Sequence, residues 1–181
     1  MRMMQIAAIA VALATSAALV QAQEPKRVQG FSVLLLLGET QGTTQPDNIS
    51  APARKALSDI KDFLPYKSFR VLDTLWLAGS DNGNKSGRLR GPDDTADRDQ
   101  QTYDFELRTF QRVPGAAPGT QDGSLSRAQF KLVARSANGG PIVMLDNSFN
   151  ITAGETVVVG TSRVQGDRAL VVLLTAVAAG K

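Results

Sequence analysis

Apolar runs of two kinds alternate along this chain. Residues 31–37 (FSVLLLL) and 170–174 (LVVLL) are apolar at successive positions, so both faces of a strand formed there would be covered. Residues 102–113 and 127–136 instead alternate apolar with polar side chains, as half-solvated antiparallel strands do. We expect the first and last runs to be central in one sheet, where they can be neighbours.

One amphipathic helix is predicted after the first strand. Ser50 is its expected N-cap, Pro52 fits its first turn, and Pro65 ends it. A strand over 67–77 should follow, with a bulge near Asp73 where its alternation changes phase. The apolar stripe of the helix consists of Ala53, Ala56, Leu57, Ile60, Phe63 and Leu64.

These elements predict an α+β fold in which a central first strand and one helix precede a mainly antiparallel sheet or sandwich, with about seven to eight strands in all. Residues 31–77 form a βαβ-like start, similar to half of a ferredoxin-like unit, and residues 102–179 form an antiparallel meander. Both belong to a single domain over 31–179, which follows a polar tether at 23–30. The side chains expected to be buried together are Leu35, Leu57, Ile60, Trp76, Phe105, Phe130, Leu145, Val158 and Leu173.

The first 22 residues have the pattern of a secretory signal peptide. Arg2 precedes an apolar run over 6–20, and Val20-Gln21-Ala22 places small residues at the cleavage positions. The run is shorter than the ~20 residues of a spanning helix, so cleavage after Ala22 is favoured over an uncleaved anchor. The pattern predicts a periplasmic or secreted protein with no membrane span after signal cleavage.

Composition removes several kinds of chemistry. The chain has no histidine and no cysteine, which excludes disulfides, thiolate metal sites and His-based catalytic groups. No cofactor is expected. The formal net charge is only +3, and the basic residues Lys85, Arg88 and Arg90 lack interleaved aromatic residues, so we interpret them as a charged loop and expect no nucleic-acid partner.

Two local motifs offer candidate sites. Asp93, Asp97 and Asp99 have the alternate spacing of a calcium-binding loop, but Arg98 stands where such a loop needs glycine, which favours a solvated loop. Ser58 and Lys61 match the Ser-x-x-Lys motif of acylating serine enzymes, without the partner motifs of those enzymes. We interpret this match as a chance feature of a helix face.

Residues 151–161 (ITAGETVVVGT) resemble the C-terminal hairpin of the bacterial secretin domain at Gly154, Thr156 and Gly160. The resemblance covers this hairpin alone, and we recognise no family over the full length. It implies that Gly154 and Glu155 form a lip that contacts a partner. As a plain turn, the same residues need only a positive φ at Gly154 and a solvated Glu155.

The sequence thus favours an exported, non-enzymatic binding or assembly module, whose partner would be another envelope protein. The alternative is a small exported hydrolase that uses carboxylates or a Ser/Lys pair. A concave pocket with two convergent acids would favour the hydrolase.

Overall fold

The computed structural model describes residues 28–79, 82–92, 101–111, 125–135, 140–164 and 166–179. Within these residues the chain forms eight strands, one α-helix and a short 3-10 helix. The elements in chain order are β1 (Val28–Glu39), α1 (Ala51–Ile60), η1 (Lys61–Phe63), β2 (Ser68–Ala78), β3 (Gly83–Arg90), β4 (Thr102–Gln111), β5 (Leu125–Ala134), β6 (Ile142–Thr152), β7 (Thr156–Arg163) and β8 (Arg168–Ala178).

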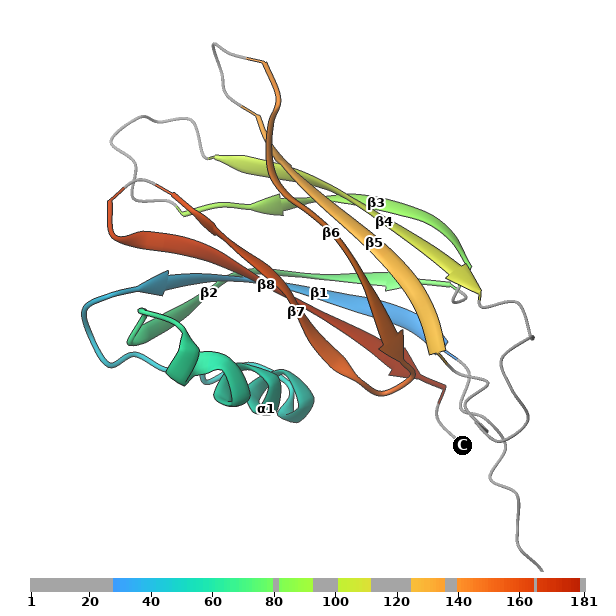
Figure 1. Ribbon diagram of the computed structural model, residues 1–181, viewed down its shortest axis with the longest axis horizontal. Coiled ribbons are helices and arrows are strands. Elements are labelled where there is room, and N and C mark those ends of the chain that lie inside the picture. Colours follow the sequence, from blue (N-terminus) through green and yellow to red (C-terminus); the bar gives the residue numbers. More distant parts are fainter. Residues whose placement is uncertain are drawn as a thin grey trace, which may run out of the picture.

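The strands form two four-stranded antiparallel sheets that pack face to face, with α1 outside the first (Figure 1). The strand order is β2-β1-β8-β7 in the first sheet and β3-β4-β5-β6 in the second. The predicted α+β class with a sandwich-like arrangement of antiparallel strands is therefore confirmed. No helix in the described part of the chain is long and apolar enough to cross a membrane.

The two runs that are apolar on both faces occupy the centre of the first sheet. β1 pairs with β8 along its length, with Leu35 opposite Val172 and Leu37 opposite Leu170. One face of both strands packs into the core between the sheets, and the other packs beneath α1. The expectation that these runs are central and adjacent is confirmed, and burial on both sides explains why neither run alternates.

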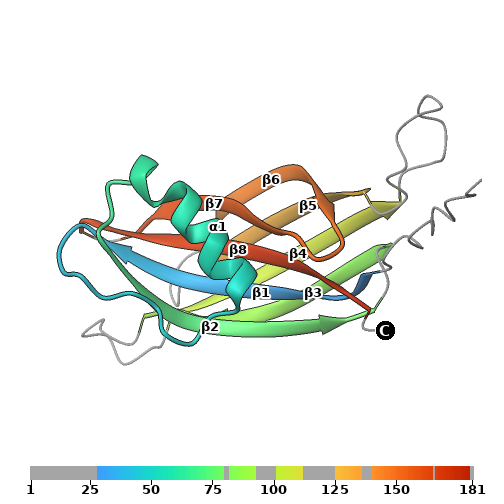
Figure 2. The ribbon, with the colours of Figure 1, turned by 90° about the horizontal axis from the view of Figure 1, so that it is seen from below.

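The helix covers part of the outer face of the first sheet (Figure 2). Ser50 caps it as predicted, since its hydroxyl accepts a hydrogen bond from the Ala53 N–H at 3.3 Å. The buried side chains of α1 are Ala53 and Leu57, which join a cluster with Leu34, Leu36, Phe69, Val171 and Leu173 of the sheet.

The α-helix is shorter than its apolar stripe predicted. It ends at Ile60, η1 follows, and Phe63 is 86% exposed instead of packed. Pro65 gives the reason, because it cannot donate to the carbonyl four residues earlier and forces the residue before it into an extended conformation. Leu64 has φ −100° and ψ 143°, so no α-helical turn continues through it.

The βαβ-like start has the predicted order of elements but not the pairing of a βαβ unit. β1 and β2 are direct neighbours and run antiparallel, with Leu34 opposite Thr74. A βαβ unit would make them parallel. The ferredoxin-like expectation is therefore wrong for residues 31–77.

Two bulges allow side chains to join the edges of the two sheets. The predicted bulge near Asp73 is present, because Leu72 is left out of the β1–β2 register. The Asp73 carboxylate accepts a hydrogen bond from the Arg90 N–H of β3 at 2.8 Å. At the opposite edge Val159 is the extra residue of β7, and the Asn147 amide of β6 donates to its carbonyl at 2.8 Å. Each open side of the sandwich is thus bridged by a side chain.

The residues expected in one core are divided between two clusters. Leu35, Phe105, Phe130 and Leu145 lie between the sheets, whereas Leu57 and Leu173 lie under α1, with Ile60 and Val158 partly buried beside them. Trp76 was predicted to be buried and is 48% exposed. It lies opposite Ser32 on the face that α1 covers. The ten-residue helix is about 15 Å long, too short to cover the roughly 36 Å length of β2.

Candidate functional site

The outer face of the second sheet is lined by charged side chains in regular rows. Alternation along the strands sends Tyr103, Phe105 and Leu107 into the core and Asp104 and Glu106 outward. Basic residues outnumber acidic ones on this outer face. They are Arg88 and Arg90 of β3, Arg108 of β4, Arg127 and Lys131 of β5 and Arg135 just after it, against Asp104, Glu106 and Asp146.

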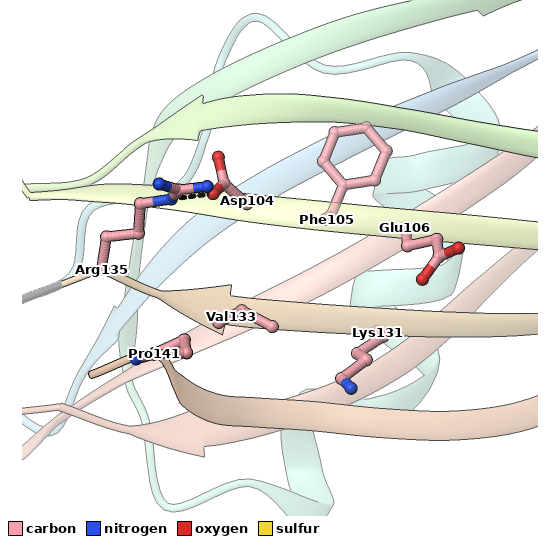
Figure 3. A pocket seen from close by; sticks show the side chains of 7 residues that line it. All are labelled: Asp104, Phe105, Glu106, Lys131, Val133, Arg135 and Pro141. Carbon is pink, nitrogen blue, oxygen red and sulfur yellow. Dashed lines mark hydrogen bonds and ion pairs between the residues drawn. The ribbon is translucent and has the colours of Figure 1, made fainter.

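Asp104 is held between two arginines from different strands. The Nε of Arg88, directly opposite on β3, donates to Asp104 Oδ1 at 2.9 Å. The Nε of Arg135 reaches back from the end of β5 to the other carboxylate oxygen (Figure 3). The hydrogen bond from Arg88, with that from Arg135 and the charges of both guanidinium groups, holds the pKa of Asp104 below its usual range.

Glu106 is paired in a similar way one row further along. Arg108, two residues away on β4, donates to Glu106 Oε1 from Nη2 at 2.9 Å, and the Asn84 amide donates to the same oxygen at 2.8 Å. These two hydrogen bonds, with the charges of Arg108 and Lys131, lower the pKa of Glu106. Lys131 lies directly opposite Glu106 on β5.

A shallow pocket of about 480 Å³ lies over these rows (Figure 3). It combines charged with apolar lining, and its residues are Asp104, Phe105, Glu106, Lys131, Val133, Arg135 and Pro141. A smaller hollow of about 110 Å³ shares Glu106 and Lys131 and extends towards Asp146, whose carboxylate accepts a hydrogen bond from Gln129 at 3.0 Å. The two hollows make one continuous polar strip across β4, β5 and β6.

The paired carboxylates Asp104 and Glu106 do not match the acid–base pair of a usual glycoside hydrolase. A glycoside hydrolase of the usual kind needs one carboxyl group that stays protonated, with a raised pKa, near a second that is ionised. Asp104 and Glu106 both have lowered pKa values because both accept hydrogen bonds from arginine. In the ionised form Asp104 and Glu106 orient the arginines that they contact, but neither carboxylate can donate a proton.

The other candidate residues do not form a site in the described structure. Asp93, Asp97 and Asp99 lie outside the described residues, and among those that are described no three acidic side chains group to hold a metal ion. Ser58 and Lys61 both line a groove of about 360 Å³ between α1 and the loop before it. They are exposed, and no hydrogen bond joins them.

The Gly154–Glu155 turn connects the two sheets rather than two neighbours in one sheet. Gly154 has φ +89°, as predicted for this turn, and its N–H donates to the Ala176 carbonyl of β8 at 2.6 Å. Glu155 is exposed, as expected for a solvated turn residue, and its carboxylate also accepts a hydrogen bond from the Thr152 N–H at 2.8 Å. Both residues thus have a structural role in the turn.

The other two residues of the secretin-like pattern also have local structural roles. The Thr156 hydroxyl lies 2.8 Å from that of Thr175 on β8. Gly160 lets β7 approach β6 closely, since a Cβ there would lie 2.9 Å from the Asn147 amide nitrogen and 3.1 Å from a Leu145 methyl. Folding requirements therefore account for Gly154, Thr156 and Gly160, and contact with a partner at this turn stays a prediction.

Comparison with protein-family models, with curated proteins and with solved structures finds no match to this chain. The site must therefore be interpreted from its own geometry.

Sequence reasoning missed the Arg88–Asp104–Arg135 group. The sequence permits either a charged loop or a short strand over Arg88-Leu89-Arg90, and these residues belong to β3. The available signal was the alternation over 102–113, which places Asp104 on the exposed face of its strand. It could not show which basic residues meet Asp104, because that depends on the register of β3 and β5 against β4.

Proposed function

We propose that this chain is an exported, non-enzymatic binding module of the cell envelope, and that the outer face of the second sheet is its binding face. The export part rests on the signal-peptide pattern of residues 1–22. The envelope partner follows from that location.

One observation carries the choice of face. The first sheet has α1 on its outer side, whereas the second presents an open strip of ordered, mostly basic side chains with a pocket of about 480 Å³. Ion pairs between exposed side chains contribute little to stability, typically below ~1 kcal/mol. Folding alone therefore gives little reason to order several arginines on one exposed face, and recognition of a partner gives a stronger one.

The test is sedimentation of the purified mature chain with envelope fragments of the source cell. The double variant Arg127→Glu/Lys131→Glu reverses two charges on the binding face, and we expect it to lose most of the binding. The matched control, Lys61→Glu/Lys67→Glu, makes the same charge change at exposed positions outside the second sheet, and it should bind like the native chain.

Equal loss in both double variants would show a general charge effect and overturn the choice of face. The non-enzymatic part has a separate test. Turnover of glycan, peptide or ester substrates that Glu106→Gln abolishes would overturn it and favour the hydrolase.

A further inference from the structure

We propose that Arg88 and Arg135 form a clamp for an oxyanion, and that the adjoining pocket holds the aliphatic part of the same small amphiphilic ligand. The inference rests on the proposed function, since it assigns a ligand class to the same face. The shared chemistry is a carboxylate or a phosphate attached to an apolar chain.

The first argument is the geometry of the two guanidinium groups. Each donates to Asp104 through Nε, and no hydrogen bond to a described residue uses the terminal nitrogens of either group. The arginine side chains are 60% and 65% exposed, against 27% for Asp104. Asp104 thus orients two guanidinium groups, and their terminal N–H groups can bind a planar or tetrahedral oxyanion in bidentate fashion.

The second argument is the local charge. Asp104 balances only one of its two arginines, and Glu106 is paired with Arg108. Lys131 lines the pocket and forms no direct ion pair with a described residue. The charged residues of the pocket lining balance, and Arg88 beside the pocket adds one further positive charge, which complements an anion.

A purely structural role explains Arg88 better than Arg135. Arg88 lies directly opposite Asp104 in the register and forms an ordinary cross-strand pair. The residue of β5 opposite Asp104 is Val133, so Arg135 reaches diagonally to a carboxylate that already has a partner. Arg135 thus places a second guanidinium group beside that of Arg88, which the pairing of Asp104 alone does not require.

The third argument concerns the apolar part of the ligand. Val133 and Pro141 line the pocket beside the clamp, and Val143 lies opposite Val133 on β6. Val143 is 53% exposed. A pocket of about 480 Å³ lies within the range of small-molecule sites, roughly 300–1,000 Å³. An apolar strip next to a cationic clamp suits an aliphatic chain that ends in an acidic group.

Calorimetric titration with four probes of equal chain length tests the proposal. Octanoate and octyl phosphate carry the two possible oxyanions, octanol has no charge, and octyltrimethylammonium has the opposite charge. We expect the native chain to bind one or both anions, and to bind octanol and the cation at least about tenfold more weakly. The preferred anion identifies the source as a carboxylate or a phosphate.

The variants Arg88→Gln and Arg135→Gln each remove one guanidinium group and should each weaken binding of the anion by about tenfold. Arg163→Gln is the matched control, since it removes the same charge from an exposed position on β7, outside the second sheet. It should change the affinity less than twofold. Circular dichroism establishes that each variant is folded.

A second measurement uses the native chain alone. Methyl NMR signals of Val133 and Val143 should shift on titration with the bound anion, whereas those of Val171, buried under α1, should not. Failure of both anions to bind, binding of octanol as tight as that of the anions, or an equal loss in Arg163→Gln would each overturn the clamp. Sedimentation with envelope fragments would still decide the binding face, so the two proposals can fail separately.

Discussion

Replacing Tyr103 by phenylalanine should make this protein more stable. Tyr103 lies on β4 with its ring in the core between the sheets, and the residue is fully buried. Its hydroxyl has no hydrogen-bond partner among the described residues. In the unfolded chain water satisfies this group, so folding removes its hydrogen bonds and returns none.

The size of the expected gain in stability follows from the cost of that lost hydrogen bonding. An unsatisfied buried hydroxyl costs about 1–3 kcal/mol, whereas the void left by one missing oxygen is small. We expect Tyr103→Phe to raise the free energy of unfolding by about 1 kcal/mol or more. For a domain of this size that corresponds to a rise in Tm of about 2–4 °C for each kcal/mol.

The pH dependence of the free energy of unfolding provides an independent test of the burial of Tyr103. Burial raises the pKa of Tyr103 to about 12, against the opposing effect of the Arg168 charge. The unfolded chain releases this proton near pH 10, before the folded chain does, so rising pH favours unfolding between pH 10 and 12. Between pH 10 and pH 12 the native chain should lose about 2 kcal/mol more than Tyr103→Phe, since each pKa unit is worth ~1.4 kcal/mol and ionisation is only half complete at each limit.

Urea unfolding at pH 7, and again across pH 10–12, measures both effects on the native chain and the variant. The chain has two tyrosines, so absorbance at 295 nm in a Tyr66→Phe background reports the ionisation of Tyr103 alone. A loss of stability in Tyr103→Phe at pH 7 would refute the reasoning, because it would mean that the hydroxyl is hydrogen-bonded. Ionisation of Tyr103 near pH 10 in the folded chain would refute its burial.

Three further substitutions test the packing and the edges of the sandwich by urea unfolding. Leu173→Ala empties a buried site under α1 and should cost about 2–5 kcal/mol; a change within ~0.5 kcal/mol would mean that the helix does not cover it. Asp73→Ala removes the bridge from β2 to β3 and should cost about 1 kcal/mol, and no change would show that the edge is held without it. At the turn, Gly154→Val should cost about 1–3 kcal/mol through its positive φ, and Glu155→Ala about 0.5–1 kcal/mol through the lost hydrogen bond; loss of envelope binding without loss of stability in Glu155→Ala would instead indicate a partner contact.

The local features of this fold could be predicted from sequence because their causes are local. The runs that became β1 and β8 show burial on both faces through their composition alone. The Ser50 cap and the positive φ at Gly154 follow from what one side chain, or its absence, permits at its own position. Even the bulge near Asp73 leaves a trace as a change of phase in the alternation.

Contacts between distant segments could not be predicted in this way. Alternation indicates that Arg88 and Asp104 lie on exposed faces of their strands, but only the register of β3 against β4 places them opposite each other. The exposure of Trp76 depends on how far α1 extends over the sheet, and the antiparallel pairing of β1 with β2 depends on which edge β2 joins. Periodicity determines which way a side chain points, whereas its neighbours are set by packing of the whole chain, so the candidate site emerged only from the tertiary structure.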